Sequence, residues 1–282
     1  MIIWLASYPK SGNTWLRSIL GSLLYTEDGI FDFKYLKKLK QFPGHMHLKE
    51  FIKDPNDIHE IKKFWIVSQE KLNLNGKINI LKTHQGNFKI DQYPFTNNQN
   101  TLATIYIVRD PRNLVNSISN HFSISKEQSL RFITSPKFLK GKFENDGKTF
   151  SHIKVFLGNW GEHYKSWTTN NDSLLLVKYE NLISNPLKEL NKIITFLKKY
   201  MDINTNDLKN ENILKSTSFE NLRKMEIDGK FFENAHTKTE GREKIRFFQQ
   251  GKDNQWQNNL DENIVKQVET TFLNEMKELG YL

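Results

Sequence analysis

A short polar segment near the start of the chain, Ser7–Trp15, contains residue types that bind phosphate groups. It follows an apolar run and precedes a stretch with helical periodicity. Lys10 supplies a full positive charge, Gly12 permits a tight turn, and the first N–H groups of the helix would point at a bound anion. The segment therefore predicts an anion-binding loop between a strand and a helix. An ordinary strand-to-helix turn with a hydroxyl cap is the alternative.

The order of residues in this loop argues against an ATP or GTP site. Such a site needs Gly-x-x-x-x-Gly-Lys followed by Ser or Thr. Here Lys10 precedes Gly12, so a P-loop nucleoside triphosphatase is disfavoured.

Arg109 and Ser117 form a second candidate anion site. Arg109 directly follows an apolar run, where a guanidinium can bind a second phosphate through two parallel hydrogen bonds. Ser117 lies roughly two turns into the next predicted helix, away from its apolar face, and could donate its hydroxyl to the same anion. The alternative, an arginine paired with a nearby carboxylate and a serine facing solvent, stays open.

Lys82 and His84 stand at the end of another apolar run, two positions apart, so both side chains are expected to leave the strand on one face. A neutral imidazole beside lysines could act as a general base. A structural role is the alternative for any single histidine among the eight in the chain.

Four short apolar runs are predicted to form the strands that position these residues. The lack of polar alternation predicts that each is buried on both faces. The runs are Ile2–Ala6, Ile78–Lys82, Ala103–Val108 and Leu174–Val177.

Helical patterns follow the first and third runs, and Asp110 and Pro111 form a predicted helix start. Strands that alternate with helices predict parallel βαβ units, in which ligands bind at the carboxyl ends of the strands. Lys10, His84 and Arg109 should therefore converge. Further helices are predicted near residues 152–169, 186–200, 207–216 and 261–279.

The composition limits the class of protein. The 282 residues include 41 Lys and Arg against 32 Asp and Glu, and the net charge of +9 indicates an anionic partner. The chain has no cysteine, which excludes disulfides, cysteine zinc sites and thiol catalysis. No apolar run approaches the ~20 residues that cross a bilayer, and Met1–Ala6 is too short for a signal peptide. We therefore expect a cytoplasmic protein.

Several segments resemble motifs of the cytosolic-type sulfotransferases, which use 3′-phosphoadenosine 5′-phosphosulfate (PAPS). Tyr8–Trp15 is similar to their 5′-phosphosulfate loop, and Tyr106–Ser117 to their 3′-phosphate motif. Lys82–His84 matches the segment that holds their catalytic base. Tyr179–Leu182 and Thr217–Phe219 also match family segments, so the resemblance covers nearly the whole chain in the right order.

The resemblance implies a single domain over residues 1–282 with a three-layer α/β fold, in which helices flank a central parallel sheet as in P-loop proteins. It implies transfer of a sulfuryl group from PAPS to a hydroxyl or amine of a small-molecule acceptor, with 3′-phosphoadenosine 5′-phosphate (PAP) as product. Neither a metal nor a nucleic-acid partner is implied. The acceptor and the oligomeric state stay open.

The resemblance also implies roles for individual residues. His84 would remove the acceptor proton, Lys10 would stabilise the leaving 5′-phosphate, and Lys82 would hold the sulfuryl oxygens. Ser117 would bind the 3′-phosphate and restrain Lys10. The residues implied to bind the donor are Lys10, Ser11, Gly12, Asn13, Thr14, Trp15, Arg109, Ser117, Tyr179, Thr217, Phe219, Arg246, Gln249, Gln250 and Gly251.

The chain departs from the family pattern at two places. Asn13 replaces the usual threonine, and Gln249 and Gln250 replace an Arg-Lys pair in the loop that covers the 3′-phosphate. Neutral amides bind phosphate more weakly than cations do. We expect either that Arg246 or Lys252 compensates or that the affinity for the donor is modest.

The acceptor region is predicted only by position. The segments Lys34–Lys71 and Arg223–Arg246 are candidates for acceptor-binding walls and a lid. Four phenylalanines could line an apolar pocket or could equally pack beneath a loop: Phe231, Phe232, Phe247 and Phe248.

Two other functions compete with sulfuryl transfer. A P-loop-type phosphotransferase would require a metal, and Asp110 is its only sequence hint. A non-catalytic module could bind nucleic acid or a sulfated glycan through its positive surface, with strong salt dependence and no turnover.

Overall fold

The computed structural model describes residues 1–139, 153–233, 246–249, 251 and 255–282. The chain forms two compact units, and it passes from one to the other several times. The single domain expected over residues 1–282 stays a prediction. Unit 1 contains Met1–Asn13, Leu39–Val108 and Thr134–Val177, and unit 2 contains Thr14–Lys38, Arg109–Ile133 and Lys178–Leu282.

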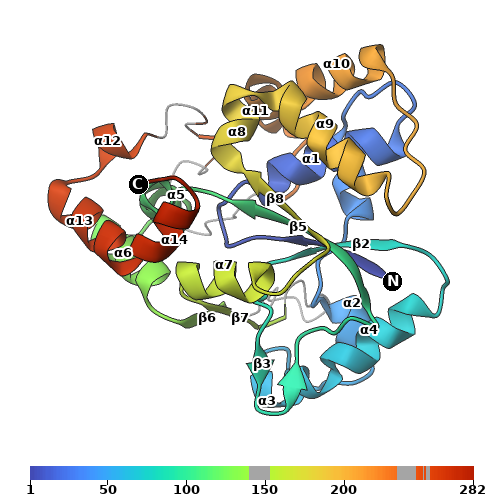
Figure 1. Cartoon of the computed structure of the whole chain (residues 1–282), viewed down its shortest axis with the longest axis horizontal. Helices are drawn as coiled ribbons and strands as arrows, with labels where there is room; N and C mark the ends of the chain where they lie inside the picture. Colours follow the sequence, from blue (N-terminus) through green and yellow to red (C-terminus); the bar gives the residue numbers. More distant parts are fainter. Residues whose placement is uncertain (140–152, 234–245, 250, 252–254) are drawn as a thin grey trace. The chain divides into compact units, whose positions relative to one another are not determined.

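A parallel sheet forms the centre of unit 1, as the sequence predicts. Ala6 is the last residue of the strand β1 (Ile2–Ala6). It is paired with Thr83 of one neighbouring strand and with Tyr106 of the other. The carboxyl ends of these strands therefore lie at one edge of the sheet. The strand order is β2 (Asn79–Thr83), β1 (Ile2–Ala6), β5 (Thr101–Val108) and β8 (Leu174–Lys178) (Figure 1).

The prediction that all four strands are buried on both faces is wrong for the outer two. Every residue of β1 and the last six residues of β5 are buried. In β2 and β8 buried residues are mixed with half-buried ones, because these strands lie at the edges of the sheet. Edge position depends on strand order, which the apolar runs do not encode.

Aromatic packing fixes the sheet of unit 1 on one side. The indole of Trp4 lies with its ring centroid 5.6 Å from that of Phe42, 5.2 Å from Phe95 and 5.9 Å from Trp167. All four side chains are almost fully buried. Their contact joins β1 to three segments that are distant in the sequence.

The helix predicted near residues 152–169 begins later than expected. Val155–Gly158 is a strand, β7, which pairs antiparallel with β6 (Lys137–Leu139). The helix α7 (Trp160–Thr168) starts after Asn159, which forms a capping box with Glu162. The other elements of unit 1 are α2 (His45–Leu48), α3 (Ile58–Ile61), η2 (Lys62–Phe64), α4 (Trp65–Asn73), β3 (Lys89–Ile90) and β4 (Tyr93–Pro94).

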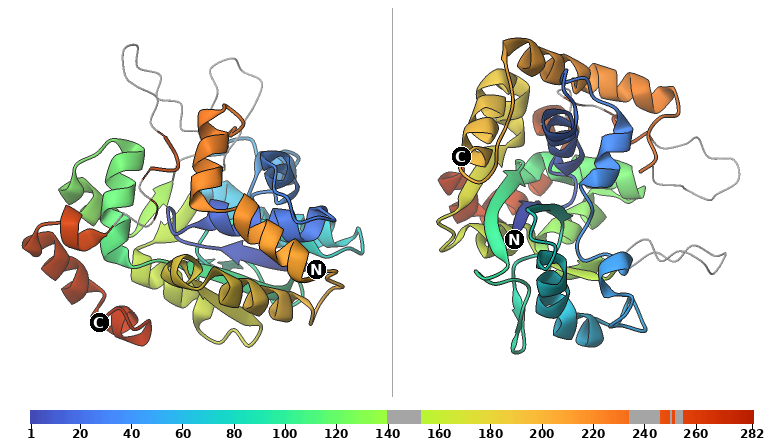
Figure 2. Two further views of the ribbon diagram at one scale, coloured as in Figure 1. Left: turned by 90° about the horizontal axis from the view of Figure 1, so that it is seen from above. Right: turned by 90° about the vertical axis from the view of Figure 1, so that its right-hand side faces the viewer.

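The regular structure in the described part of unit 2 is mainly helical, and its first helix begins at Asn13, which ends the first segment of unit 1. Figure 2 shows that the chain changes direction between α10 (Asp207–Ser216) and α11 (Phe219–Ile227), both in orange tones. The elements are α1 (Asn13–Tyr25), η1 (Phe33–Lys38), α5 (Pro111–Phe122), α6 (Lys126–Thr134), α8 (Tyr179–Ser184), α9 (Pro186–Leu197), α10 (Asp207–Ser216), α11 (Phe219–Ile227), α12 (Trp256–Asn259), α13 (Glu262–Thr271) and α14 (Leu273–Glu278).

Most predicted helices of unit 2 are present. The side chain of Asp110 accepts a hydrogen bond from the backbone of Arg112, and Pro111 is the first helical residue of α5, as expected. The helix predicted over residues 261–279 is divided into α13 and α14 at Phe272. None of the helices in the described ranges is both long enough and apolar enough to cross a membrane.

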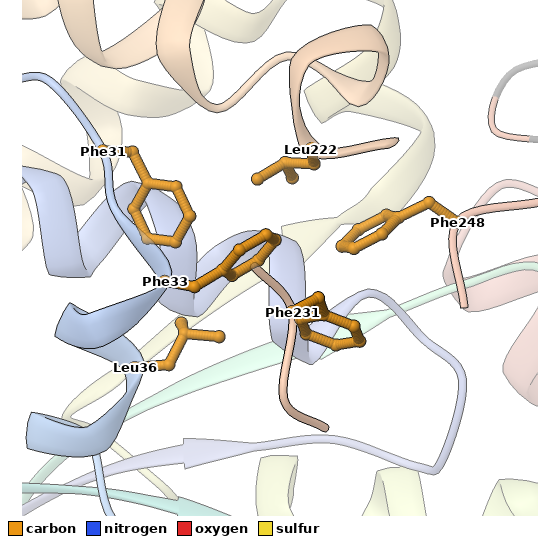
Figure 3. Packing of buried hydrophobic residues seen from close by; sticks show 6 residues of the cluster. All are labelled: Phe31, Phe33, Leu36, Leu222, Phe231 and Phe248. Carbon is orange, nitrogen blue, oxygen red and sulfur yellow. The ribbon is translucent and has the colours of Figure 1, made fainter. Parts of the chain in front are cut away.

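A cluster of buried apolar side chains forms a core in unit 2 (Figure 3). Phe231 and Phe248, two of the candidates for an acceptor pocket, are part of it and are almost fully buried. Phe231 and Phe248 are therefore core residues and do not line a pocket. Phe247 is half-buried, and Phe232 is 45% exposed with the Lys37 amine 5.1 Å from its ring centroid. The cluster consists of Phe31, Phe33, Leu36, Leu222, Phe231 and Phe248.

Burial in the sheet predicts a sharp difference between two leucines of unit 1. Leu5 is fully buried in β1, whereas Leu74 is 85% exposed. Replacing Leu5 by Ala should lower the free energy of unfolding by about 2–5 kcal/mol, because it leaves a cavity. Leu74→Ala is the matched control and should change it by less than ~0.5 kcal/mol. Urea denaturation followed by circular dichroism measures both, and equal losses would contradict the placement of β1 at the centre.

Candidate active site

The loop after β1 has a backbone suited to binding an anion. Lys10 has a φ of 69° and Gly12 a φ of 104°. Left-handed residues in such a turn orient neighbouring N–H groups to one side, where they attract negative charge. Glycine adopts this conformation readily, whereas lysine does so at a cost of about 1–2 kcal/mol. The backbone at Lys10 is therefore strained relative to a glycine at the same position.

Ser11 provides a second sign of a ligand at the same loop. Its side chain is 1% exposed, and its Oγ has no hydrogen-bond partner among the described residues. A buried polar group without a partner costs about 1–3 kcal/mol. A phosphate or sulfate oxygen would satisfy this hydroxyl, so the loop fits an anionic group.

Asn13 holds the loop against the end of β1. Its Nδ2 donates hydrogen bonds to the backbone oxygen of Leu5 and to the Oγ of Ser7, both at 3.1 Å. Its Oδ1 is buried and has no partner within the described residues. An asparagine therefore ties the first residue of α1 to the strand that precedes the loop.

The imidazole of His84 is connected to the same segment. Its Nδ1 lies 2.8 Å from the backbone oxygen of Ser7 and 3.2 Å from the Ser7 Oγ. Because a carbonyl oxygen can only accept, Nδ1 carries the ring proton in this hydrogen bond. In the neutral imidazole Nε2 then holds a lone pair, as a general base requires.

Lys82 precedes His84 by two residues and is held by a segment outside the named strands. Its backbone N–H donates to the oxygen of Lys40, and its own oxygen accepts from Phe42, both at 2.8 Å. Lys82 and His84 are half-buried, whereas Thr83 between them is fully buried. This alternation agrees with both side chains leaving on the same face.

Two buried residues behind His84 were missed by sequence reasoning. The Nε2 of His163 lies 3.1 Å from the backbone oxygen of His84, and its Nδ1 lies 2.8 Å from the hydroxyl of Tyr106. Complete burial lowers the pKa of His163 to about 4. The signal for it was present in the sequence: His163 shares one helical face with Trp160 and Trp167, so its polar ring must be buried.

Three of the predicted donor-binding residues come together in unit 2. The Arg109 guanidinium lies 4.1 Å from the ring centroid of Tyr179, and the Trp15 ring contacts Tyr179 edge-on with a centroid separation of 5.5 Å. The carboxylate nearest in sequence, Asp110, is bound by Arg112 through a salt bridge of 2.7 Å. Asp110 thus caps α5 and is paired with Arg112, which argues against a role as a metal ligand.

Glu180 is a further residue that the sequence did not single out. One of its carboxylate oxygens accepts the backbone N–H of Asp110 at 3.0 Å, and the other accepts the Tyr281 hydroxyl at 2.9 Å. It therefore holds the backbone next to Arg109 and Tyr179. Arg112 donates to the backbone oxygen of Tyr281 at 2.9 Å and completes this clamp.

Gly251 and Phe219, both predicted to bind the donor, are in contact. Gly251 has a φ of 52°, and a Cβ placed on it would lie 2.8 Å from the ring of Phe219. Thr217 is buried, and its hydroxyl donates to the backbone oxygen of Ile213 at 2.7 Å. Its hydrogen is thus used within α10, and only its lone pairs can face a ligand.

The remaining predicted residues are placed as follows. Thr14 is buried at the start of α1, and Ser117 is half-buried on α5. Arg246 is exposed and Gln249 is half-buried, whereas Gln250 and Lys252 lie outside the described residues. Across the described part of the chain, no group of three or more His, Asp and Glu could hold a metal ion.

The comparisons with known proteins identify the class. The family model described as "Sulfotransferase domain" matches residues 2–280, and the chain belongs to this family. "Sulfotransferase 1B1" of Mus musculus is 29% identical over 225 residues, which cover 78% of this chain but only 65% of that protein, just under two thirds. "Flavonol 3-sulfotransferase" of Flaveria bidentis is 25% identical over 275 residues, and the alignment covers 95% of this chain and 79% of that protein.

Solved structures agree in fold. Mouse sulfotransferase SULT7A1 complexed with PAP has a TM-score of 0.56 and 22% identity, and it covers 98% of this chain and 84% of its own. Retinol dehydratase in a complex with retinol and PAP has a TM-score of 0.58 and 18% identity, with coverage of 98% and 81%. The family and the α/β fold with a central parallel sheet are therefore confirmed.

The low pKa of His163 predicts how stability depends on pH. Between the ordinary value of 6.5 and about 4, the unfolded chain binds a proton at this histidine that the folded chain does not. Its contribution should therefore lower the free energy of unfolding by ~1.4 kcal/mol for each unit that the pH falls through this window. His47, with its pKa lowered to about 4 by burial and by Lys40, acts in the same direction.

Urea denaturation across this window measures the effect. His163→Gln should make the loss of stability with falling pH shallower by about one proton. His59→Gln, at an exposed position, is the control for replacing a histidine by glutamine. Parallel slopes for wild type and His163→Gln would show that His163 is not buried in the neutral form.

Proposed function

We propose that the protein is a PAPS-dependent sulfotransferase that moves a sulfuryl group to a hydroxyl or amine of a small-molecule acceptor and releases PAP. One observation carries this proposal. Ser7 connects the proposed anion-binding loop of unit 1 to the proposed general base. Its Oγ accepts a hydrogen bond from Asn13 of the loop, and its backbone oxygen accepts one from His84. A potential base is thus tied to a potential phosphosulfate loop.

In the proposed reaction, the lone pair on His84 Nε2 takes the acceptor proton. The acceptor oxygen or nitrogen attacks sulfur in line, and the bond from sulfur to the 5′-phosphate oxygen breaks, with its electron pair going to the phosphate. Lys10 and the backbone N–H groups of its loop stabilise this charge, and Ser11 donates its buried hydroxyl. Lys82 holds the oxygens of the sulfuryl group.

The residues of unit 2 are proposed to bind the nucleoside part of the donor. The rings of Trp15 and Tyr179, which contact each other, suit the adenine, and the buried Arg109 suits the 3′-phosphate. The contact of Gly251 with Phe219 supports a joint role for these two. The proposed set for adenine and the 3′-phosphate is Thr14, Trp15, Arg109, Ser117, Tyr179, Thr217, Phe219, Arg246, Gln249, Gln250 and Gly251.

The acceptor is proposed to be a small organic molecule. The names of two relatives mention a flavonol and retinol, which supports this class without selecting a member. Transfer is proposed to proceed without a metal, because cationic side chains and backbone donors neutralise the donor charge. A cytoplasmic location stays a prediction from the sequence.

Nucleotide binding and turnover test the function together. PAP should raise the melting temperature of the protein far more than adenosine 5′-phosphate, which lacks the 3′-phosphate. Incubation with PAPS and a panel of phenols, alcohols and amines should release PAP for at least one acceptor, with no loss on adding EDTA. A metal requirement would favour the phosphotransferase alternative. Salt-sensitive polymer binding without turnover would favour the non-catalytic module.

Two substitutions should separate chemistry from donor binding. His84→Ala should lower kcat by a factor of ~10²–10⁴, because it removes the general base, and should leave the PAP dissociation constant nearly unchanged. Arg109→Ala should instead weaken PAP binding first, because it removes a charged phosphate donor. His59→Ala, at an exposed position, is the control. Steady-state kinetics and calorimetry measure both effects, and full turnover by His84→Ala would overturn the proposed base.

A further inference from the structure

His163 forms hydrogen bonds on both sides of its ring, and its protonation state follows from them. Its Nε2 lies 3.1 Å from the backbone oxygen of His84, which can only accept. Nε2 must therefore carry the proton. Since burial keeps the ring neutral at physiological pH, Nδ1 has the lone pair and must accept from its own partner.

Tyr106 is that partner. Its hydroxyl lies 2.8 Å from Nδ1 of His163, and both side chains are fully buried. Burial raises the pKa of Tyr106 well above its ordinary value, so its hydroxyl keeps the proton that it donates. The hydrogen bonds run in one direction, from Tyr106 through His163 to the carbonyl of His84.

Rigid elements hold both ends of this chain of hydrogen bonds. Tyr106 belongs to β5 and is paired with Ala6 of β1, and His163 belongs to α7, next to β5 in unit 1 (Figure 1). The ring of Tyr8 contacts His163 edge-on, with centroids 5.5 Å apart. His163 is thus enclosed by the sheet and by the start of the anion loop.

His84 itself lies one residue beyond the end of β2. The carbonyl of His84 accepts from His163, while its imidazole donates to the carbonyl of Ser7. The hydrogen bond from His163 therefore restrains the backbone from which the imidazole projects, and a misplacement of about 1 Å in a catalytic group can cost about 100-fold in rate.

We infer that His163 and Tyr106 are positioning residues for the proposed general base. They hold the His84 carbonyl in place. The His84 ring then keeps its hydrogen bond from Nδ1–H to the backbone oxygen of Ser7 and directs Nε2 toward the acceptor. Neither residue touches the reacting atoms in this scheme. The inference rests on the role proposed above for His84.

Nitrogen-15 NMR of histidine-labelled protein tests the inference without an acceptor. Comparison with His84→Asn assigns the His84 ring signals. Wild-type His84 should show the tautomer with the proton on Nδ1, and His163→Leu should show a mixture of both tautomers. His163→Gln, whose amide can still donate to the His84 carbonyl, should restore the wild-type signals. Tyr106→Phe, which changes little volume, should give an intermediate result and covers the case that His163→Leu does not fold.

Kinetics give a second readout once an acceptor is known. His163→Leu should lower kcat about 100-fold while PAP binding and the KM for PAPS stay at wild-type values, and His163→Gln should recover most of the rate. His59→Leu, at an exposed site, is the control. Wild-type His84 signals and wild-type kcat in folded His163→Leu would overturn the inference. If the wild-type protein binds no PAP, the proposed function fails, and the NMR result still decides whether His163 positions His84.

Discussion

The hydrogen bond from His84 Nδ1 to the carbonyl of Ser7 is the interaction on which the proposed chemistry of unit 1 depends. It joins the residue after β2 to the residue after β1, and it can form because these two strands run parallel and end at the same level. It also selects which ring nitrogen retains a lone pair. The pairing of two apolar strands thereby determines which nitrogen of the His84 ring carries the proton.

The same logic extends outward through neighbouring hydrogen bonds. Asn13 attaches the loop to Ser7, and His163 and Tyr106 attach the backbone of His84 to β5 and α7. In unit 2 a carboxylate has the comparable task, because Glu180 binds the backbone beside Arg109. Buried polar groups are costly unless they are satisfied, so such networks favour a single arrangement over its alternatives.

The sequence predicted the parts that depend on local order. The loop with Lys10 and Gly12 and the cap at Asp110 lie within a few residues of the elements they serve, so their patterns were legible. The edge positions of β2 and β8 were not, because they depend on which strands pair. The burial of His163 was legible from its helical face, but its partners were not, because Tyr106 and His84 lie 57 and 79 positions away along the chain.

The left-handed backbone at Lys10 has a consequence for how this protein can change. Glycine would relax that conformation and leave the fold more stable, but it would remove the ammonium group from the loop. Uncharged amino acids with a side chain would in general keep the penalty and remove the positive charge. Stability of the fold and attraction for anions therefore favour different residues at position 10. A search for heat-tolerant variants would select glycine there and lose the positive charge of the loop.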